Sequence, residues 1–210
     1  MNIDRREANH HLGPMGKRAD EKIRTKERII QAASTLIRER GIAGLKVADV
    51  MAAASLTHGA FYAHFADKDE LIEAAFHKAL DHREAWFSAA AKQPPKDRLE
   101  HLAQTYLTDL HRDAPQNGCA FASLARDFAQ AGGPFPKLFE AELNVSLNRL
   151  TKLLVSNAPE DDRQRAMGLL SLCVGGMVLA RAVDDPTLSN NLLKAAAAFG
   201  ATAGSPETKT

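Results

Sequence analysis

Residues 55–65 read SLTHGAFYAHF, and this stretch decides the fold by the way it mixes aromatic and polar side chains. Phe61 and Phe65 are four residues apart, so in a helix they fall on one face, which we expect to pack against neighbouring helices. The opposite edge can then bond phosphate oxygens or base edges in a major groove about 12 Å wide. The residues of that edge are Thr57, His58, Gly59, Tyr62 and His64.

The segments just before this stretch predict a helix-turn-helix. From Asp20 onward apolar residues recur at helical spacing, and Gly41 is a C-terminal stop signal. Residues 46–55, KVADVMAAAS, predict a short second helix with its apolar residues on one side. A tight connection then leads to a third helix starting near Thr57, whose hydroxyl we expect to cap that helix. Three helices in this order form a helix-turn-helix arrangement.

The tract LTHGAFYAHFADKDEL, residues 56–71, closely resembles the recognition-helix motif of the tetracycline-repressor (TetR) family of bacterial one-component regulators. In that family a small polar residue precedes x-Gly-x-aromatic-Tyr-x-His-Phe, and a Lys then opens the next helix. The resemblance covers Arg24 to Ala75, whereas farther along only the length and the run of helices agree. It implies that Thr57, His58 and Gly59 approach base edges. It also implies that phosphates are held by Lys46, Tyr62, His64 and Lys68.

Two residues depart from the family pattern. Lys46 stands where the family often has a hydroxyl residue, so the second helix is expected to lack its usual N-cap. Ser55 stands where the family often has Gly in the turn, so a left-handed conformation there would carry modest strain. His64 also has a simpler alternative, in which it only caps the end of its helix.

The rest of the chain predicts further helices and no strand, because no segment alternates apolar and polar residues over a sufficient length. Asp67 followed by Glu70 resembles a capping box, and it opens a helix expected to run to about Ala91. Leu99, Leu102, Tyr106 and Leu110 mark another helix. Later helices are expected through residues 121–128 and near 136–156, 160–183 and 186–199. The expected fold is all-α with about nine helices.

The charged residues are unevenly distributed along the chain. Residues 1–66 hold 11 Lys/Arg against 7 Asp/Glu, net +4, whereas the remainder has net −3. The basic first part fits a polyanion partner, although a chance imbalance on a solvated surface explains the charge nearly as well.

The sequence predicts four parts: a mobile basic arm (1–20), a helix-turn-helix DNA-binding domain (21–68), a larger ligand-binding and dimerisation domain (69–200) and a disordered tail (201–210).

Two helices near the end of the chain predict a dimer. The helix at 160–183 is apolar nearly all round, so it must be covered on every side. A four-helix seam built from two helices of each subunit would do this, and it resembles the dimerisation mode of the TetR family. An intramolecular core is the alternative. The expected seam residues are Leu170, Cys173, Gly176, Met177, Leu192, Leu193 and Ala197.

Aromatic residues on several middle helices can line an apolar cavity with a few polar groups. Ordinary core packing explains most of them equally well, so the cavity is mainly what the family resemblance implies. The candidate ligand-binding residues are Trp86, Tyr106, Cys119, Phe121, Arg126, Phe128 and Phe139. Cys119 precedes a helix, whose N-terminus raises thiol reactivity, so thiol-redox sensing is an alternative to its being a small buried residue.

Several classes of protein are not supported by the sequence. It carries no Gly-rich phosphate loop, GxSxG or HExxH motif, so we expect neither an enzyme nor a cofactor. His77 and His82 are five residues apart, off the spacing that aims two imidazoles at one ion, so no metal site is expected. The charge-free stretch 166–180 is 15 residues long, and a membrane span needs about 20. We expect a cytoplasmic protein.

The expected function is that of a ligand-responsive transcriptional regulator, most simply a repressor. As a homodimer it would bind a palindromic operator in double-stranded DNA and be released by an apolar small molecule. An activator, or a ligand-independent architectural DNA-binding protein, remains an alternative. Dissociation from DNA by a small molecule would separate the last of these from a regulator.

Overall fold

The computed structural model describes residues 14–154 and 159–202, and within these ranges the chain forms ten α-helices and three short 3-10 helices. The all-α prediction is therefore confirmed. The first elements are α1 (Pro14–Gly44), α2 (Val47–Ala53), the 3-10 helix η1 (His58–Ala63), α3 (Lys68–Ala79) and α4 (His82–Ala91). The remaining ones are η2 (Pro95–Asp97), α5 (Arg98–Tyr106), α6 (Asp109–Asp113), η3 (Pro115–Asn117), α7 (Ala120–Ala131), α8 (Phe135–Leu154), α9 (Pro159–Ala182) and α10 (Pro186–Thr202).

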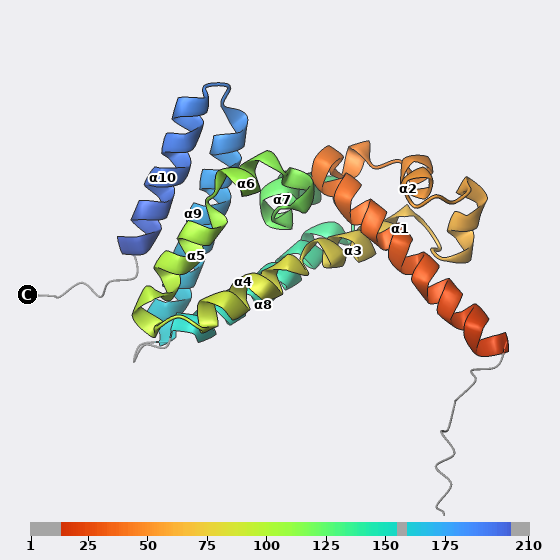
Figure 1. Cartoon of the computed structure of the whole chain (residues 1–210), viewed down its shortest axis with the longest axis horizontal. Helices are drawn as coiled ribbons and strands as arrows, with labels where there is room; N and C mark the ends of the chain where they lie inside the picture. Colours follow the sequence, from red (N-terminus) through yellow and green to blue (C-terminus); the bar gives the residue numbers. More distant parts are fainter. Residues whose placement is uncertain (1–13, 155–158, 203–210) are drawn as a thin grey trace, which may run out of the picture.

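The helix-turn-helix lies at one end of the molecule, built from α1, α2 and η1 (Figure 1). Its core is apolar: Phe61 and Phe65 are each 2% exposed, and they pack with buried residues of α1 and α2 such as Ile29 and Met51. The two Phe rings stack with centroids 5.6 Å apart and planes at 19°. The predicted aromatic underside of this stretch is thus buried in the domain core.

The first helix differs from its prediction at both ends. It begins at Pro14, so residues 14–20 are helical and not part of an arm; the rest of the predicted arm, residues 1–13, lies outside the described residues. Gly41 interrupts the helix with a φ of 72°, which is the predicted stop, and a further short turn runs to Gly44. A Cβ at Gly41 would lie 2.2 Å from a carboxylate oxygen of Asp127, so both the backbone and the space require glycine there.

Two predicted helices are broken into pairs. The helix expected from Asp67 to Ala91 is interrupted between Ala79 and His82 and becomes α3 and α4, which follow one another along α8 (Figure 1). The helix expected through Leu110 ends at Tyr106, because the Thr108 hydroxyl accepts a bond from His111 N–H and caps the new helix α6. Leu110 is consequently 81% exposed and lies on α6, so the prediction that it continues the helix of Leu99, Leu102 and Tyr106 is wrong.

The start of α3 has the predicted capping box. Asp67 accepts a hydrogen bond from the Glu70 N–H at 2.9 Å. The Glu70 carboxylate reaches back to the Ala66 N–H at 2.8 Å, one residue before the position usual for this motif. These bonds fix the angle at which the chain leaves the helix-turn-helix.

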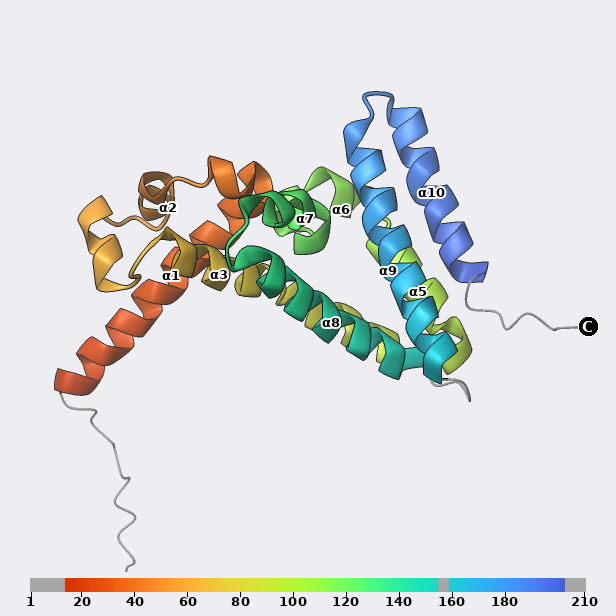
Figure 2. The same cartoon turned by 180° about the vertical axis from the view of Figure 1, so that it is seen from behind.

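The far end of the molecule is a helix hairpin. Figure 2 shows α9 and α10 side by side, with α8 running from their base back toward the helix-turn-helix. α7 packs against both α1 and α8, so it joins the helix-turn-helix to the rest of the chain. Residues 203–210, most of the predicted disordered tail, lie outside the described residues, whereas positions 201 and 202 belong to α10.

The turn between α2 and η1 has the left-handed residue that the sequence indicated. Ser55 has a φ of 58°, the single positive φ among the described residues other than glycine. Ser55→Gly should therefore raise the free energy of unfolding by about 1 kcal/mol, because glycine adopts this conformation without the Cβ penalty. Urea denaturation measures the change. Ser88→Gly, the same substitution on an exposed position inside α4, should instead lower it.

Candidate DNA-binding edge and ligand cavity

The predicted DNA-contacting edge is open to solvent. Thr57, His58 and Gly59 are exposed, and Tyr62 is 71% exposed. A Cβ added to Gly59 would meet no atom within 4 Å, so the edge is slim at this point. The segment is a 3-10 helix instead of the expected α-helix, and the Thr57 side chain forms no cap, so that prediction is wrong. Helices of the 3-10 type occur in short pieces, and this one has six residues.

Contacts beneath this edge hold it in place. The Lys26 ammonium of α1 lies 4.8 Å from the centroid of the Phe65 ring and bonds the Glu70 carboxylate at 3.1 Å. On the other side, Arg40 of α1 pairs with Asp49 of α2 at 2.9 Å. Contacts with α1 and α3 therefore hold the exposed edge in position.

The three remaining DNA candidates lie in different surroundings. Lys46 is exposed and forms no cap for α2, as its departure from the family pattern indicated. Lys68 is half-buried, and its ammonium donates to the Ile42 carbonyl at 3.3 Å. His64 is also half-buried; burial, with Lys22 and Lys26 nearby, lowers its pKa. Its Nδ1 has no partner in the described part of the chain, so it does not cap the helix through this atom.

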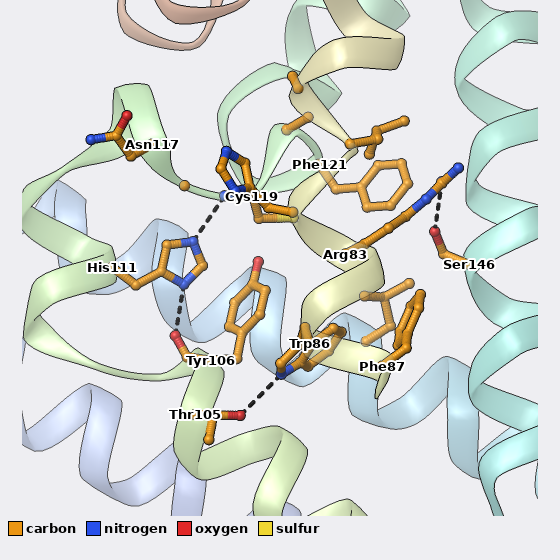
Figure 3. A pocket seen from close by; sticks show the side chains of 16 residues that line it. Arg83, Trp86, Phe87, Thr105, Tyr106, His111, Asn117, Cys119, Phe121 and Ser146 are labelled. Carbon is orange, nitrogen blue, oxygen red and sulfur yellow. Dashed lines mark hydrogen bonds between the residues drawn. The ribbon is translucent and has the colours of Figure 1, made fainter. Parts of the chain in front are cut away.

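A second candidate site is a cavity of about 220 Å³ between α4, α5, α7, α8 and the turn before α7 (Figure 3). Four of the predicted ligand-binding residues line it: Trp86, Tyr106, Cys119 and Phe121. Three others lie elsewhere. Phe128 and Phe139 pack with Phe76 in the neighbouring aromatic core, and Arg126 is exposed on α7. The predicted roles of these three residues in ligand binding are therefore not supported by their positions.

The cavity also contains polar residues that the sequence analysis missed. Arg83 crosses to α8, where it donates to Ser146 at 3.1 Å and pairs with Glu142 at 2.5 Å (Figure 3). His111 accepts the Cys119 N–H on Nε2 at 2.9 Å and donates from Nδ1 to the Tyr106 carbonyl at 2.7 Å. Burial lowers the pKa of His111, in keeping with this neutral form.

The wall of the cavity is tied directly to the helix-turn-helix. Arg38 of α1 is 4% exposed, and its guanidinium donates to the Gly118 carbonyl at 3.0 Å. Asp127 of α7 accepts the Ile42 N–H at 3.3 Å, at the end of α1. A displacement of the turn at Gly118 would thus reach α1 through the Arg38 bond, and a displacement of α7 would reach it through the Asp127 bond. No signal in the sequence pairs Arg38 with a residue 80 positions away.

The residues of α9 that were predicted to form the dimer seam lie on the buried side of that helix. Leu170, Cys173 and Met177 are buried within the subunit, as is Leu193 of α10, so these residues belong to the intramolecular core. Burial raises the pKa of Cys173 to about 12. Gly176 also faces inward, because a Cβ there would lie 3.0 Å from Ala196. The two remaining predicted seam residues, Leu192 and Ala197, are half-buried.

An apolar face is nevertheless exposed on the hairpin. We define the hairpin face as the exposed large apolar residues of α9 and α10: Met167, Val178, Leu179, Leu188 and Phe199. A Cβ on Gly168 or Gly175 would meet nothing within 4 Å, so another helix could approach α9 closely. By length and composition α9 could also cross a membrane, a property that buried helices of soluble proteins share.

Comparisons with known proteins agree with the site geometry. The model of the family described as bacterial regulatory proteins, tetR family, matches residues 29–75, which include α2, η1 and most of α3. The chain is 34% identical over 97 residues to the transcriptional regulator CymR of Pseudomonas putida, and 38% identical over 66 residues to the transcriptional regulator TtgR of the same species. These matches cover 43% and 30% of this chain, and only 48% and 31% of the two regulators.

The similarity to known structures extends beyond the helix-turn-helix to most of the chain. A TetR transcriptional regulator from Chloroflexus aurantiacus superimposes with a TM-score of 0.73 at 21% identity, over 87% of this chain and 95% of that structure. The sequence match therefore identifies the first domain, and the structural match shows that the remaining helices are arranged as in the same group. Residues 29–75 thus match the family of bacterial regulatory proteins, tetR family, and the fold of the chain as a whole is similar to that of a TetR transcriptional regulator.

Proposed function

We propose that this protein is a ligand-responsive, sequence-specific transcriptional regulator, acting as a repressor in the bacterial cytoplasm. The observation that carries the proposal is the exposed edge of Thr57, His58, Gly59 and Tyr62 above the buried rings of Phe61 and Phe65. Hydroxyls, an imidazole and a phenol on a slim edge suit contact with base edges and phosphates in a major groove.

A homodimer is the second part of the proposal. The hairpin face exposes apolar side chains at the end of the molecule opposite the DNA-binding edge (Figure 1). Pairing this face with that of a second copy would cover it and would create a two-fold axis. Two recognition edges related by that axis match a palindromic operator, with half-sites about 34–36 Å apart.

Ligand control is the third part. The cavity wall at Gly118 and Cys119 is bonded to α1 through Arg38, while α3 and α4 run from the helix-turn-helix along the cavity. A ligand that binds better when this wall is displaced would favour a state in which the two edges are wrongly spaced for DNA. The ligand can shift the equilibrium only by its difference in affinity for the two states.

Selection of DNA from a random pool with the purified full chain tests this function. The expected result is enrichment of one inverted repeat, whose affinity falls steeply with salt because phosphates are contacted. A small molecule that lowers this affinity, without unfolding the protein, would support ligand control. Enrichment of no sequence would contradict the regulator assignment, and an asymmetric unrepeated sequence would contradict the dimer.

A further inference from the structure

The cavity contains one buried polar group that is left for a ligand. Tyr106 is 5% exposed, and its hydroxyl makes no hydrogen bond of normal geometry to any described residue, although the Cys119 thiol is near. Figure 3 shows this hydroxyl directed toward Cys119 from the cavity floor. A buried hydroxyl without a partner is costly, so a cavity that retains one is suited to a ligand carrying an acceptor.

The other polar groups of the wall are already bonded within the protein. Trp86 Nε1 donates to the Thr105 hydroxyl at 3.1 Å, and that hydroxyl donates to the His101 carbonyl at 2.7 Å. Both ring nitrogens of His111 are engaged, and the Arg83 guanidinium is held by Glu142 and Ser146. His82 and Asn117 are exposed residues at the rim. The Tyr106 hydroxyl is thus the buried donor that a ligand can recruit without breaking a bond.

Positively charged groups lie at the Gly118 turn, beside this hydroxyl. Two guanidinium groups approach the Gly118 turn from behind the wall: Arg38 donates to the Gly118 carbonyl, and Arg181 donates to the His111 carbonyl at 2.7 Å. Among the described residues neither arginine forms an ion pair with a carboxylate. Asp113, whose charge acts on Arg181, is paired with Arg112. The 12-residue helix α7 also begins here, with its positive end at the cavity.

The remaining walls are aromatic and the space is small. Trp86, Phe87 and Phe121 line it together with Leu170. A cavity of about 150 Å³ lined by apolar side chains holds one benzene molecule. A volume of about 220 Å³ therefore accommodates one ring with one or two short substituents.

We propose that the effector is a monocyclic aromatic acid whose carboxylate accepts a hydrogen bond from the Tyr106 hydroxyl and whose ring packs against Trp86 and Phe121. This inference rests on the proposed function and adds the chemical class of its ligand. The buried guanidinium of Arg38, the half-buried one of Arg181 and the start of α7 offset part of the cost of bringing a carboxylate out of water. Because the carboxylate would lie at the turn that Arg38 holds, binding would act directly on the contact with α1.

Fluorescence provides a site-specific assay, because Trp86 is the single tryptophan of the chain and lies in the cavity wall. The probes are benzoate and 4-methylbenzoate, with benzamide as the neutral analogue of the same shape. Both acids should change the Trp86 emission saturably, and benzamide should bind at least about tenfold more weakly. Tyr106→Phe should weaken benzoate binding by about tenfold or more, the loss expected for a hydrogen bond to a charged acceptor.

Two controls keep the test specific. Tyr62→Phe makes the same change in the other tyrosine of the chain, which is exposed and distant from the cavity, and should leave benzoate binding unchanged. Tyr106→Phe without ligand should melt no lower than wild type, because it removes an unpartnered buried hydroxyl. Loss of benzoate binding in a protein of undiminished melting temperature then reports the hydroxyl and not the fold.

The outcomes separate the ligand class from the function. Equal binding of benzoate by wild type and Tyr106→Phe, equal binding of benzoate and benzamide, or binding of neither would overturn the proposed ligand class. If DNA is still selected as an inverted repeat in those cases, the regulator assignment stands with a different effector. If benzoate binds through Tyr106 but no DNA sequence is selected, the ligand class stands and the regulator assignment fails.

Discussion

Phe61→Ala is expected to lower the free energy of unfolding by about 3–5 kcal/mol and to abolish selective DNA binding. The Phe61 side chain is 2% exposed and stacks on Phe65 beneath the DNA-contacting edge. Its removal would leave a void in a small core and would release the edge from α1 and α2. Chemical denaturation of the purified variant, followed by circular dichroism, measures the loss.

The adjacent residue provides the control. Tyr62→Ala also removes an aromatic ring, but that ring is 71% exposed, so the free energy of unfolding should change by no more than about 0.5 kcal/mol. Similar losses in the two variants would show that the two rings are equally buried. In that case the division of this stretch into a packed underside and an open edge would be wrong.

Leu179→Glu should weaken dimerisation by roughly 100-fold or more while leaving the subunit folded. Leu179 is 55% exposed in the subunit and belongs to the hairpin face, so the two-fold axis would place two unpaired carboxylates in the apolar seam. The operator affinity should fall by at least a similar factor, because the two half-sites would no longer be bound by one assembly. Analytical ultracentrifugation across a dilution series measures the dissociation constant.

Leu110→Glu is the matched control for the hairpin face. Leu110 is 81% exposed and lies on α6, outside α9 and α10, so the same substitution there should leave the dimer intact. A Leu179→Glu protein that remains fully dimeric at the lowest measurable concentration would place the subunit interface elsewhere.

The sequence predicted the helix-turn-helix well because its signals are local. Phe61 and Phe65 are related by helical spacing, Ser55 occupies a turn position where glycine is common, and the box of Asp67 and Glu70 opens a helix within four residues. The structure has the buried pair, the positive φ and the capping bonds at these positions. The 3-10 form of residues 58–63 was harder to predict, because a glycine-containing segment of six residues has little preference between helix types.

The rest could not be predicted from the sequence for physical reasons. A helix that is apolar nearly all round has no polar side to orient it, so the sequence did not distinguish the buried side of Leu170 from the exposed side of Leu179. Arg38 meets the Gly118 turn through a contact between distant segments, which periodicity does not reveal. The break between α5 and α6 had a local signal in Thr108, an N-cap residue followed by Asp109, but the spacing of Leu110 masked it.

The affinity of the Tyr62→Ala protein for its selected DNA tests the central claim most directly. Because this side chain is exposed on the edge and contributes little to the fold, the account predicts at least about tenfold weaker DNA binding at an unchanged unfolding curve. Wild-type affinity in the Tyr62→Ala protein, measured at the same salt concentration, would contradict the assignment of this edge to DNA.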